Sequence, residues 1–104
     1  MPYTRGFDPA LLADHFTRHG PGVGASTKEE YEALADEFMG ASLDSTTQQC
    51  IRSYSGDILR FRSATQEFGI LTKYGVIRTY YKPNPRRLPF PTNYVYFQQE
   101  CKKP

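Results

Sequence analysis

The strongest constraint on the fold of this chain is the stretch of residues 56–83, in which three strand-like segments are separated by two short turns. The segments DILRFR, QEFGILT and VIRTYY are rich in β-branched and aromatic residues, which favour extended backbone. Turns are expected at residues 63–65 and 73–75, and Gly75 supplies the positive φ that a tight hairpin needs. The stretch therefore predicts an antiparallel meander.

Basic side chains are concentrated in the same part of the chain. Residues 51–104 carry 10 basic and 3 acidic side chains, a net charge of +7, whereas residues 1–50 carry 3 basic and 8 acidic ones, a net charge of −5. Either the two halves balance each other within one fold, or the strands form a site for a polyanion, and we favour the second interpretation. Strand alternation places Arg60 and Arg62 on one face, and it sets Arg78, Tyr80 and Lys82 opposite Ile77, Thr79 and Tyr81.

The first half of the chain shows helical periodicity. Asp8 is a candidate N-cap with Pro9 at the first helical position, and the apolar spacing predicts a helix near residues 9–19 that ends at Gly20. Ser26 or Thr27 opens a second helix near residues 27–39. Residues 50–54 are expected to form a first strand before the meander. A chain of 104 residues suits one small domain, so we predict an α+β fold, with amino-terminal helices packed on an antiparallel sheet of about four strands within residues 50–82.

The tail and the two cysteines leave alternatives open. The tail YVYFQQECKK fits either a last strand or a short helix, and we favour a helix or irregular segment that packs its aromatic rings on the sheet. Cys50 and Cys101 either form a disulfide between the first strand and the tail or remain two buried thiols. Their spacing does not match a zinc site. No apolar run approaches the roughly 20 residues of a spanning helix, so we expect no membrane association.

The histidines are the first candidates for chemistry. His15 and His19 are four residues apart and share one helical face. The motif HFTRH lacks the Glu of HExxH and a third ligand, so we predict neither a metal site nor a cofactor. A pair of histidines can instead act as general base and general acid, although such residues often lie at a helix surface or core edge without a catalytic role.

If the first helix packs on the meander, the histidines lie near cations and hydroxyls suited to a phosphodiester. The base removes the proton of an RNA 2′-hydroxyl, the oxygen attacks the phosphorus, cations hold the extra charge, and the acid protonates the leaving 5′-oxygen. RNA supplies its own nucleophile, and the sequence contains no GxSxG elbow. Tyr80 or Tyr81 can stack on an unpaired base, or both can pack in the core. The candidate residues are His15, His19, Arg60, Arg62, Thr79 and Tyr81 for catalysis, and Arg78, Tyr80 and Lys82 for substrate binding.

Four motifs in this order, HFTRHG, EYEALADEF, GDILRFRSATQEFGIL and YGVIRTYYKP, resemble the carboxy-terminal toxin domains of bacterial polymorphic and contact-dependent growth inhibition systems. The resemblance covers residues 14–83. Those domains belong to the barnase/EndoU/colicin/RelE-like superfamily of metal-independent ribonucleases, many of which cut transfer RNA. The resemblance implies that His15 and His19 are the paired histidines, that Arg60 or Arg62 is the strand cation, and that Thr79, Tyr81 and Lys82 form the polar cluster of the last strand. Which histidine is the base stays open.

The resemblance also implies partners and a location. A larger parent protein would carry this domain to its carboxy terminus and deliver it from the cell that makes it into the cytoplasm of a target bacterium, where it would cleave RNA, in particular transfer RNA. A cognate immunity protein would inhibit it, and the basic meander predicts that this inhibitor is acidic. Two other classes remain: an RNA-binding module that uses the same basic face without cleavage, and an interaction domain with no role at RNA.

Overall fold

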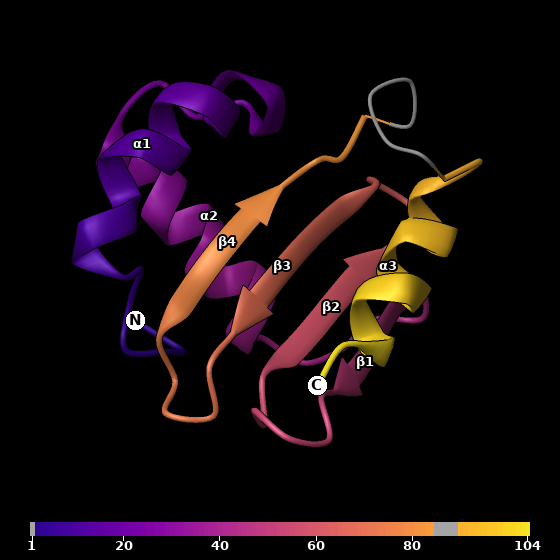
Figure 1. The fold of residues 1–104 in the computed structure, drawn as a ribbon. Helices are drawn as coiled ribbons and strands as arrows, with labels where there is room; N and C mark the ends of the chain where they lie inside the picture. Colours follow the sequence, from indigo (N-terminus) through magenta and orange to yellow (C-terminus); the bar gives the residue numbers. More distant parts are fainter. Residues whose placement is uncertain (1, 85–89) are drawn as a thin grey trace.

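The computed structural model describes residues 2–84 and 90–104, and within them a four-stranded antiparallel sheet lies between two layers of α-helix (Figure 1). Helices α1 (Pro9–His19) and α2 (Lys28–Gly40) precede the strands and are joined by the short 3-10 helix η1 (Pro21–Val23), while α3 (Asn93–Lys102) follows them. The predicted α+β fold is confirmed. The last helix covers the sheet face opposite to α1 and α2.

The helices begin where the sequence signals place them. The Asp8 carboxylate accepts a hydrogen bond from the Ala10 amide, and the Thr27 hydroxyl accepts one from the Glu30 amide. Both contacts satisfy amide groups that a helix start leaves without an intrahelical partner. Within the described residues, no helix is long and apolar enough to cross a membrane.

The strands β1 (Thr47–Ile51), β2 (Ile58–Arg62), β3 (Glu67–Leu71) and β4 (Ile77–Tyr81) pair in sequence order, each antiparallel to the next. The meander is therefore confirmed. The first strand begins at Thr47 rather than Cys50, because the Asp44 carboxylate accepts hydrogen bonds from Thr46 and Thr47 and fixes the turn before it. It ends at Ile51, where the chain turns through Gly56, which has a φ of 77°.

A β-bulge in β4 corrects the predicted alternation of that strand. Ile70 pairs with Thr79 but Leu71 pairs with Ile77, so Arg78 is the extra residue. As a result Ile77 and Tyr80 lie on the same face and both are buried in the core beneath α1 and α2. The prediction that set Tyr80 beside Arg78 and Ile77 beside Thr79 is wrong.

Two apolar clusters hold the layers together. Tyr31, Ala35, Phe38 and Met39 of α2 pack against the face of the sheet that carries Tyr80. On the other face, Phe97 of α3 packs against Leu59, Phe61 and Phe68. Gly69 allows the first contact, since a Cβ atom at this position would lie 2.5 Å from the Met39 sulfur. Both faces of the sheet are therefore used for packing, and α3 covers β2 more than β4.

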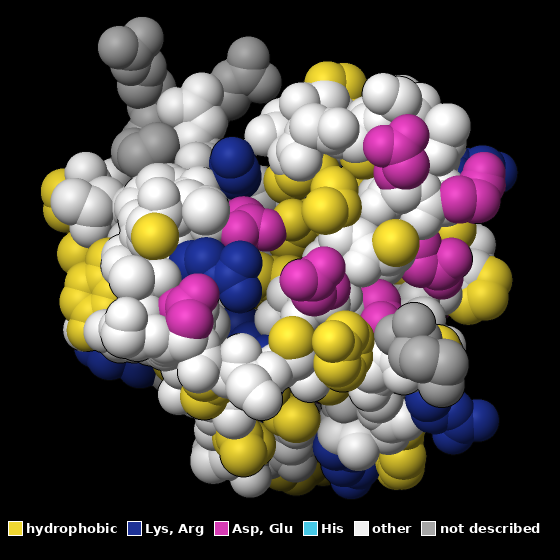
Figure 2. Space-filling model, turned by 180° about the vertical axis from the view of Figure 1, so that it is seen from behind, with side chains coloured by type: hydrophobic (Ala, Val, Ile, Leu, Met, Phe, Trp, Pro, Cys, Tyr) yellow, Lys and Arg dark blue, Asp and Glu magenta, His cyan; other side chains and the backbone are white. Residues whose placement is uncertain are grey.

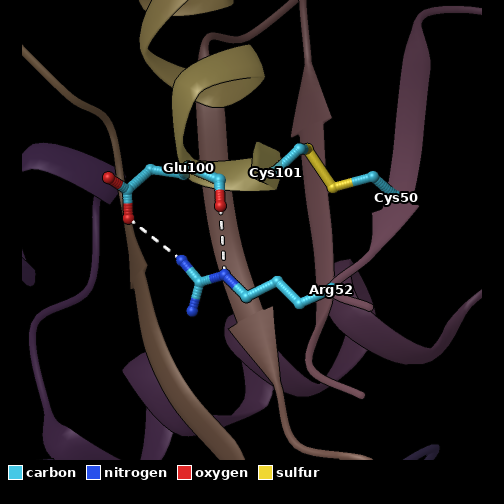
Figure 3. The surroundings of a disulfide bond; sticks show 4 residues. All are labelled: Cys50, Arg52, Glu100 and Cys101. Atoms are coloured by element: carbon cyan, nitrogen blue, oxygen red, sulfur yellow. Dashed lines mark hydrogen bonds and ion pairs between the residues drawn. A yellow bond between two sulfur atoms is a disulfide. The ribbon is translucent and has the colours of Figure 1, made fainter. Parts of the chain in front are cut away.

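The cysteines form a disulfide, which resolves the alternative left open by the sequence. The bond joins Cys50 of β1 to Cys101 of α3 (Figure 3). Beside it, Arg52 donates from Nε to the backbone oxygen of Glu100 at 3.0 Å and from Nη2 to its carboxylate at 3.1 Å. Arg52 also pairs with the buried Asp57. The carboxyl end of α3 is thus attached to β1 by one covalent bond and by charge-assisted hydrogen bonds.

Candidate functional site

Helix α1 places both histidines beside β4. The ring centroids of His15 and His19 are 5.7 Å apart. Nδ1 of His15 lies 3.2 Å from the hydroxyl oxygen of Thr79, and the ring of His19 stacks on Tyr81 with centroids 4.5 Å apart. We call these four residues the histidine site. The spacing of four residues on α1 brings the two histidine rings together. The face of β4 opposite to Tyr80 supplies the two hydroxyl-bearing residues, Thr79 and Tyr81.

Aromatic residues support the histidine site from behind. Phe7 meets the ring of His15 edge-on with centroids 5.5 Å apart. The Tyr81 hydroxyl lies 2.7 Å from the hydroxyl of Tyr96, and both tyrosine rings pack on Phe68. Sequence reasoning missed Phe7 and Tyr96. A signal for Tyr96 was present in the tail, where Asn93, Tyr96, Phe97, Glu100 and Cys101 follow the spacing of one helical face.

The electrostatic surroundings favour neutral histidines. Partial burial lowers the pKa of His15, and the positive charge of Arg18 lowers it further. The pKa of His19 is lowered by the same burial, by Arg18 and by the neighbouring His15. Arg18 is itself paired with Asp14 at 2.8 Å on the exposed side of α1, and Asp14 raises both histidine pKa values in part. At neutral pH both rings are therefore able to accept a proton.

Arg60 and Arg62 lie on one face of β2, as alternation predicts, but this face is the one that α2 covers. Arg60 donates to the backbone oxygens of Phe38 and Ala41 at the end of α2, at 3.1 and 2.7 Å. Arg62 pairs with Asp44 and Glu67 at 3.2 and 3.3 Å. Both guanidinium groups are therefore engaged by the protein on the face opposite to Thr79 and Tyr81.

The three predicted substrate-binding residues differ in their accessibility. Arg78 is 55% exposed and lies 3.9 Å from the Asp57 carboxylate. Lys82 is exposed and directly follows Tyr81. Tyr80 is only 1% exposed, and its hydroxyl donates to the Glu67 carboxylate, so its ring is not available to a base. Of the cations on or beside the histidine site, Arg18 and Lys82 are exposed, and sequence reasoning had not included Arg18.

The opposite side of the molecule, where α2 lies, shows acidic and basic side chains intermingled, and neither histidine is visible there (Figure 2). A groove of about 820 Å³ is lined by the amino-terminal segment and by residues of α2, including Glu29, Glu32, Asp36 and Glu37, but by no histidine. Within residues 2–84 and 90–104, no group of three or more His, Cys, Asp and Glu side chains is placed to hold a metal ion.

The histidine site is thus the one place in the described residues where two imidazoles, two hydroxyl-bearing side chains and an exposed cation, Arg18, adjoin. Such a set can transfer protons to and from a phosphodiester and can bind its charge. No protein-family model and no curated protein sequence matches this chain.

Proposed function

We propose that this domain is a metal-independent endoribonuclease that cleaves RNA, in particular transfer RNA, by transesterification through the 2′-hydroxyl. The observation that carries the proposal is the histidine pair, with rings 5.7 Å apart and half-buried beside Thr79 and Tyr81. Two neighbouring, half-buried imidazoles, one of which contacts a hydroxyl, suit proton transfer to and from a bound substrate.

In this mechanism one histidine is neutral and takes the proton of the 2′-hydroxyl. The 2′-oxygen then forms a bond to phosphorus, the bond from phosphorus to the 5′-oxygen breaks, and the second histidine, protonated, gives its proton to that leaving oxygen. The products are a 2′,3′-cyclic phosphate and a free 5′-hydroxyl. The Thr79 hydroxyl positions His15 through the 3.2 Å contact, and Tyr81 positions His19 by stacking.

Exposed cations bind the substrate phosphate in this proposal. Arg18 lies next to the histidines on α1, Lys82 directly follows Tyr81 in the chain, and both side chains are exposed. Arg60 and Arg62 instead stabilise the junction of α2 with β1, β2 and β3, through the contacts described above. Removing Lys82 is therefore expected to weaken RNA binding more strongly at low salt, because its contribution is a phosphate contact.

The resemblance to toxin domains supports a biological setting for this chemistry. We propose that the domain is the carboxy-terminal part of a larger secreted or surface-delivered protein and that it inhibits growth of a target bacterium from inside its cytoplasm. A cognate acidic immunity protein blocks it by covering the histidine site and the adjacent exposed cations. Complementary charge raises the rate of such an association.

Cleavage of transfer RNA in the presence of EDTA tests the proposal. Wild-type protein should yield ends with 2′,3′-cyclic phosphate, and His15→Ala and His19→Ala should each lower kcat/KM by about 10² or more. Thr17→Ala is the matched control, because Thr17 lies on the exposed side of α1 and bonds only to Ala13 of its own helix. Urea denaturation of each variant shows whether the fold is retained.

Three outcomes would exclude the proposal. The first is full activity in the double variant His15→Ala/His19→Ala. The second is activity that EDTA abolishes and added zinc or magnesium restores. If the protein binds RNA with strong salt dependence but cuts none of it, the domain is a binding module rather than a nuclease.

A further inference from the structure

One face of the sheet carries a row of residues that leads away from the histidine site. Gln48 pairs with Phe61, Phe61 with Phe68, and Phe68 with Tyr81, one residue from each strand. With a strand spacing of about 4.8 Å, the two ends of this row are roughly 14 Å apart. Tyr81 and His19 lie at one end, and α3 crosses the middle, where Phe97 packs on Phe61 and Phe68.

A groove of about 520 Å³ lies at the other end of the row. Its lining comes from β1, β2, the turn after β2 and the start of α3, and it contains no charged residue. This volume is within the range of about 300–1,000 Å³ that suits small organic ligands. The rings of Phe61 and Tyr94, with centroids 6.3 Å apart, form the aromatic part of the lining.

The polar groups of the groove are not equally available to a ligand. The Gln66 amide is used internally, since its nitrogen donates to Ser63 and its oxygen accepts from Asn93. Gln48, by contrast, is exposed and forms no side-chain hydrogen bond with any other residue in the described ranges. The neighbouring Tyr94 ring is 39% exposed. The groove thus offers a ligand one accessible aromatic face and one carboxamide that can donate and accept together.

We infer that this groove is a nucleobase subsite, which holds an unpaired base of the RNA several nucleotides from the bond that is cut. The inference rests on the proposed ribonuclease activity. A base is a planar, uncharged ring whose edge carries donors and acceptors, so it can stack on Tyr94 and bond with the Gln48 carboxamide. The lining carries no cation for a phosphate, and the groove lies on the sheet face that carries Tyr81, so an RNA strand that passes around α3 can reach both places.

Substrate length tests the inference. Tyr94→Ala should lower kcat/KM for an unstructured RNA octanucleotide by about 5- to 100-fold, the range expected for loss of one stacked base. Gln48→Ala should lower it by about 2- to 10-fold, the range expected for loss of one hydrogen bond. The same variants should leave kcat/KM for a dinucleotide unchanged, because a dinucleotide occupies only the histidine site. Tyr94→Phe keeps the ring and should retain most of the activity. Gln98→Ala and Tyr54→Ala change exposed residues outside the groove and serve as controls.

A binding measurement separates this inference from the proposed function. A fully 2′-O-methylated octanucleotide cannot be cleaved, and its addition to ¹⁵N-labelled protein should shift the side-chain amide signals of Gln48 in wild type but not in Tyr94→Ala. If the protein cleaves RNA and these signals stay in place, the subsite is absent while the ribonuclease proposal stands. If the signals shift but no RNA is cut, the base-binding groove stands and the catalytic proposal fails. Equal losses of activity on the dinucleotide and the octanucleotide would also overturn the subsite.

Discussion

Removal of the disulfide should lower the free energy of unfolding by a predictable amount. Cys50 and Cys101 are separated by 51 positions, and closing a loop of that length in the unfolded chain removes conformational entropy worth about 4 kcal/mol at 25 °C. Domains of this size are stable by only about 5–15 kcal/mol in total. The bond is therefore expected to supply between a quarter and most of the net stability.

The same change should leave the folded geometry in place. Helix α3 is also held by Phe97, which packs on Phe61 and Phe68, and by the hydrogen bonds that Arg52 donates to Glu100. These contacts exist only in the folded state, whereas the disulfide acts mainly on the unfolded one. Tyr96 should thus continue to support Tyr81, and activity per folded molecule should be unchanged.

Urea denaturation of Cys50→Ala/Cys101→Ala measures the effect. With an m-value of about 2 kcal/mol per M, a loss of 4 kcal/mol lowers the midpoint by about 2 M. Wild type treated with a reducing agent should match the double variant, and Lys102→Ala, an exposed neighbour on α3, should match untreated wild type. A midpoint within about 0.3 M of wild type would show that the loop-closure argument is wrong for this chain. A fall in kcat/KM under fully folded conditions would show that the bond also shapes the histidine site.

Three further predictions concern pH, an ion pair and a glycine. The mechanism needs one neutral and one protonated histidine, and the pKa values of both His15 and His19 are lowered. The value of kcat/KM should therefore be highest below a pH of about 6.5 and should fall as the pH rises above it. A pH profile with its maximum above 7 would contradict this. Arg62→Met should lower the free energy of unfolding in urea by about 2 kcal/mol, because it leaves the buried Glu67 carboxylate without its cation. Arg78→Met removes a more exposed guanidinium and should stay within about 0.5 kcal/mol of wild type. Equal effects of the two substitutions would refute the distinction. Gly69→Ala should destabilise the fold by about 1–3 kcal/mol, because the new Cβ atom would lie too close to Met39, Phe38 and Thr79. Gly22→Ala is the control: its Cβ atom would meet nothing within 4 Å, so the change should be neutral or slightly stabilising. A Gly69→Ala protein as stable as wild type would mean that α2 can move away from β3 at little cost.

Local signals predicted most of the fold because the structure obeys them. The Asp8 and Thr27 caps define where two helices start, and both carboxylate and hydroxyl make the expected bonds. The spacing of His15 and His19 likewise predicted that their rings would be neighbours, as the structure confirms. The contact of His15 with Thr79 joins residues 64 positions apart, and it depends on how α1 docks on β4. Periodicity within one element carries no information about such a contact.

The bulge at Arg78 shows a second limit of sequence reasoning. The extra residue in β4 moves Ile77, which precedes it, to the face opposite to the one that regular alternation predicts. Nothing in the sequence VIRTYY distinguishes a bulged strand from a regular one. The covering of Arg60 and Arg62 is a similar case. Alternation shows that they share a face, but only the packing of α2 shows that this face is closed. Glu67, the cross-strand partner of Arg62, was a usable hint, since a carboxylate opposite an arginine often neutralises it.

Charge along the chain and charge presented to a partner are different quantities in this protein. The second half has a net charge of +7, yet Arg52 and Arg62 are paired with Asp57, Glu100, Glu67 and Asp44, and Arg60 donates to the end of α2. Those cations hold the layers together and are largely screened from solvent. What an RNA or an acidic inhibitor meets beside the histidines is set by exposed cations such as Arg18 and Lys82. The sign of a binding surface therefore follows from which charges the fold leaves exposed to solvent. For this domain one such residue, Arg18, which forms an exposed ion pair with Asp14, comes from the half with the negative net charge.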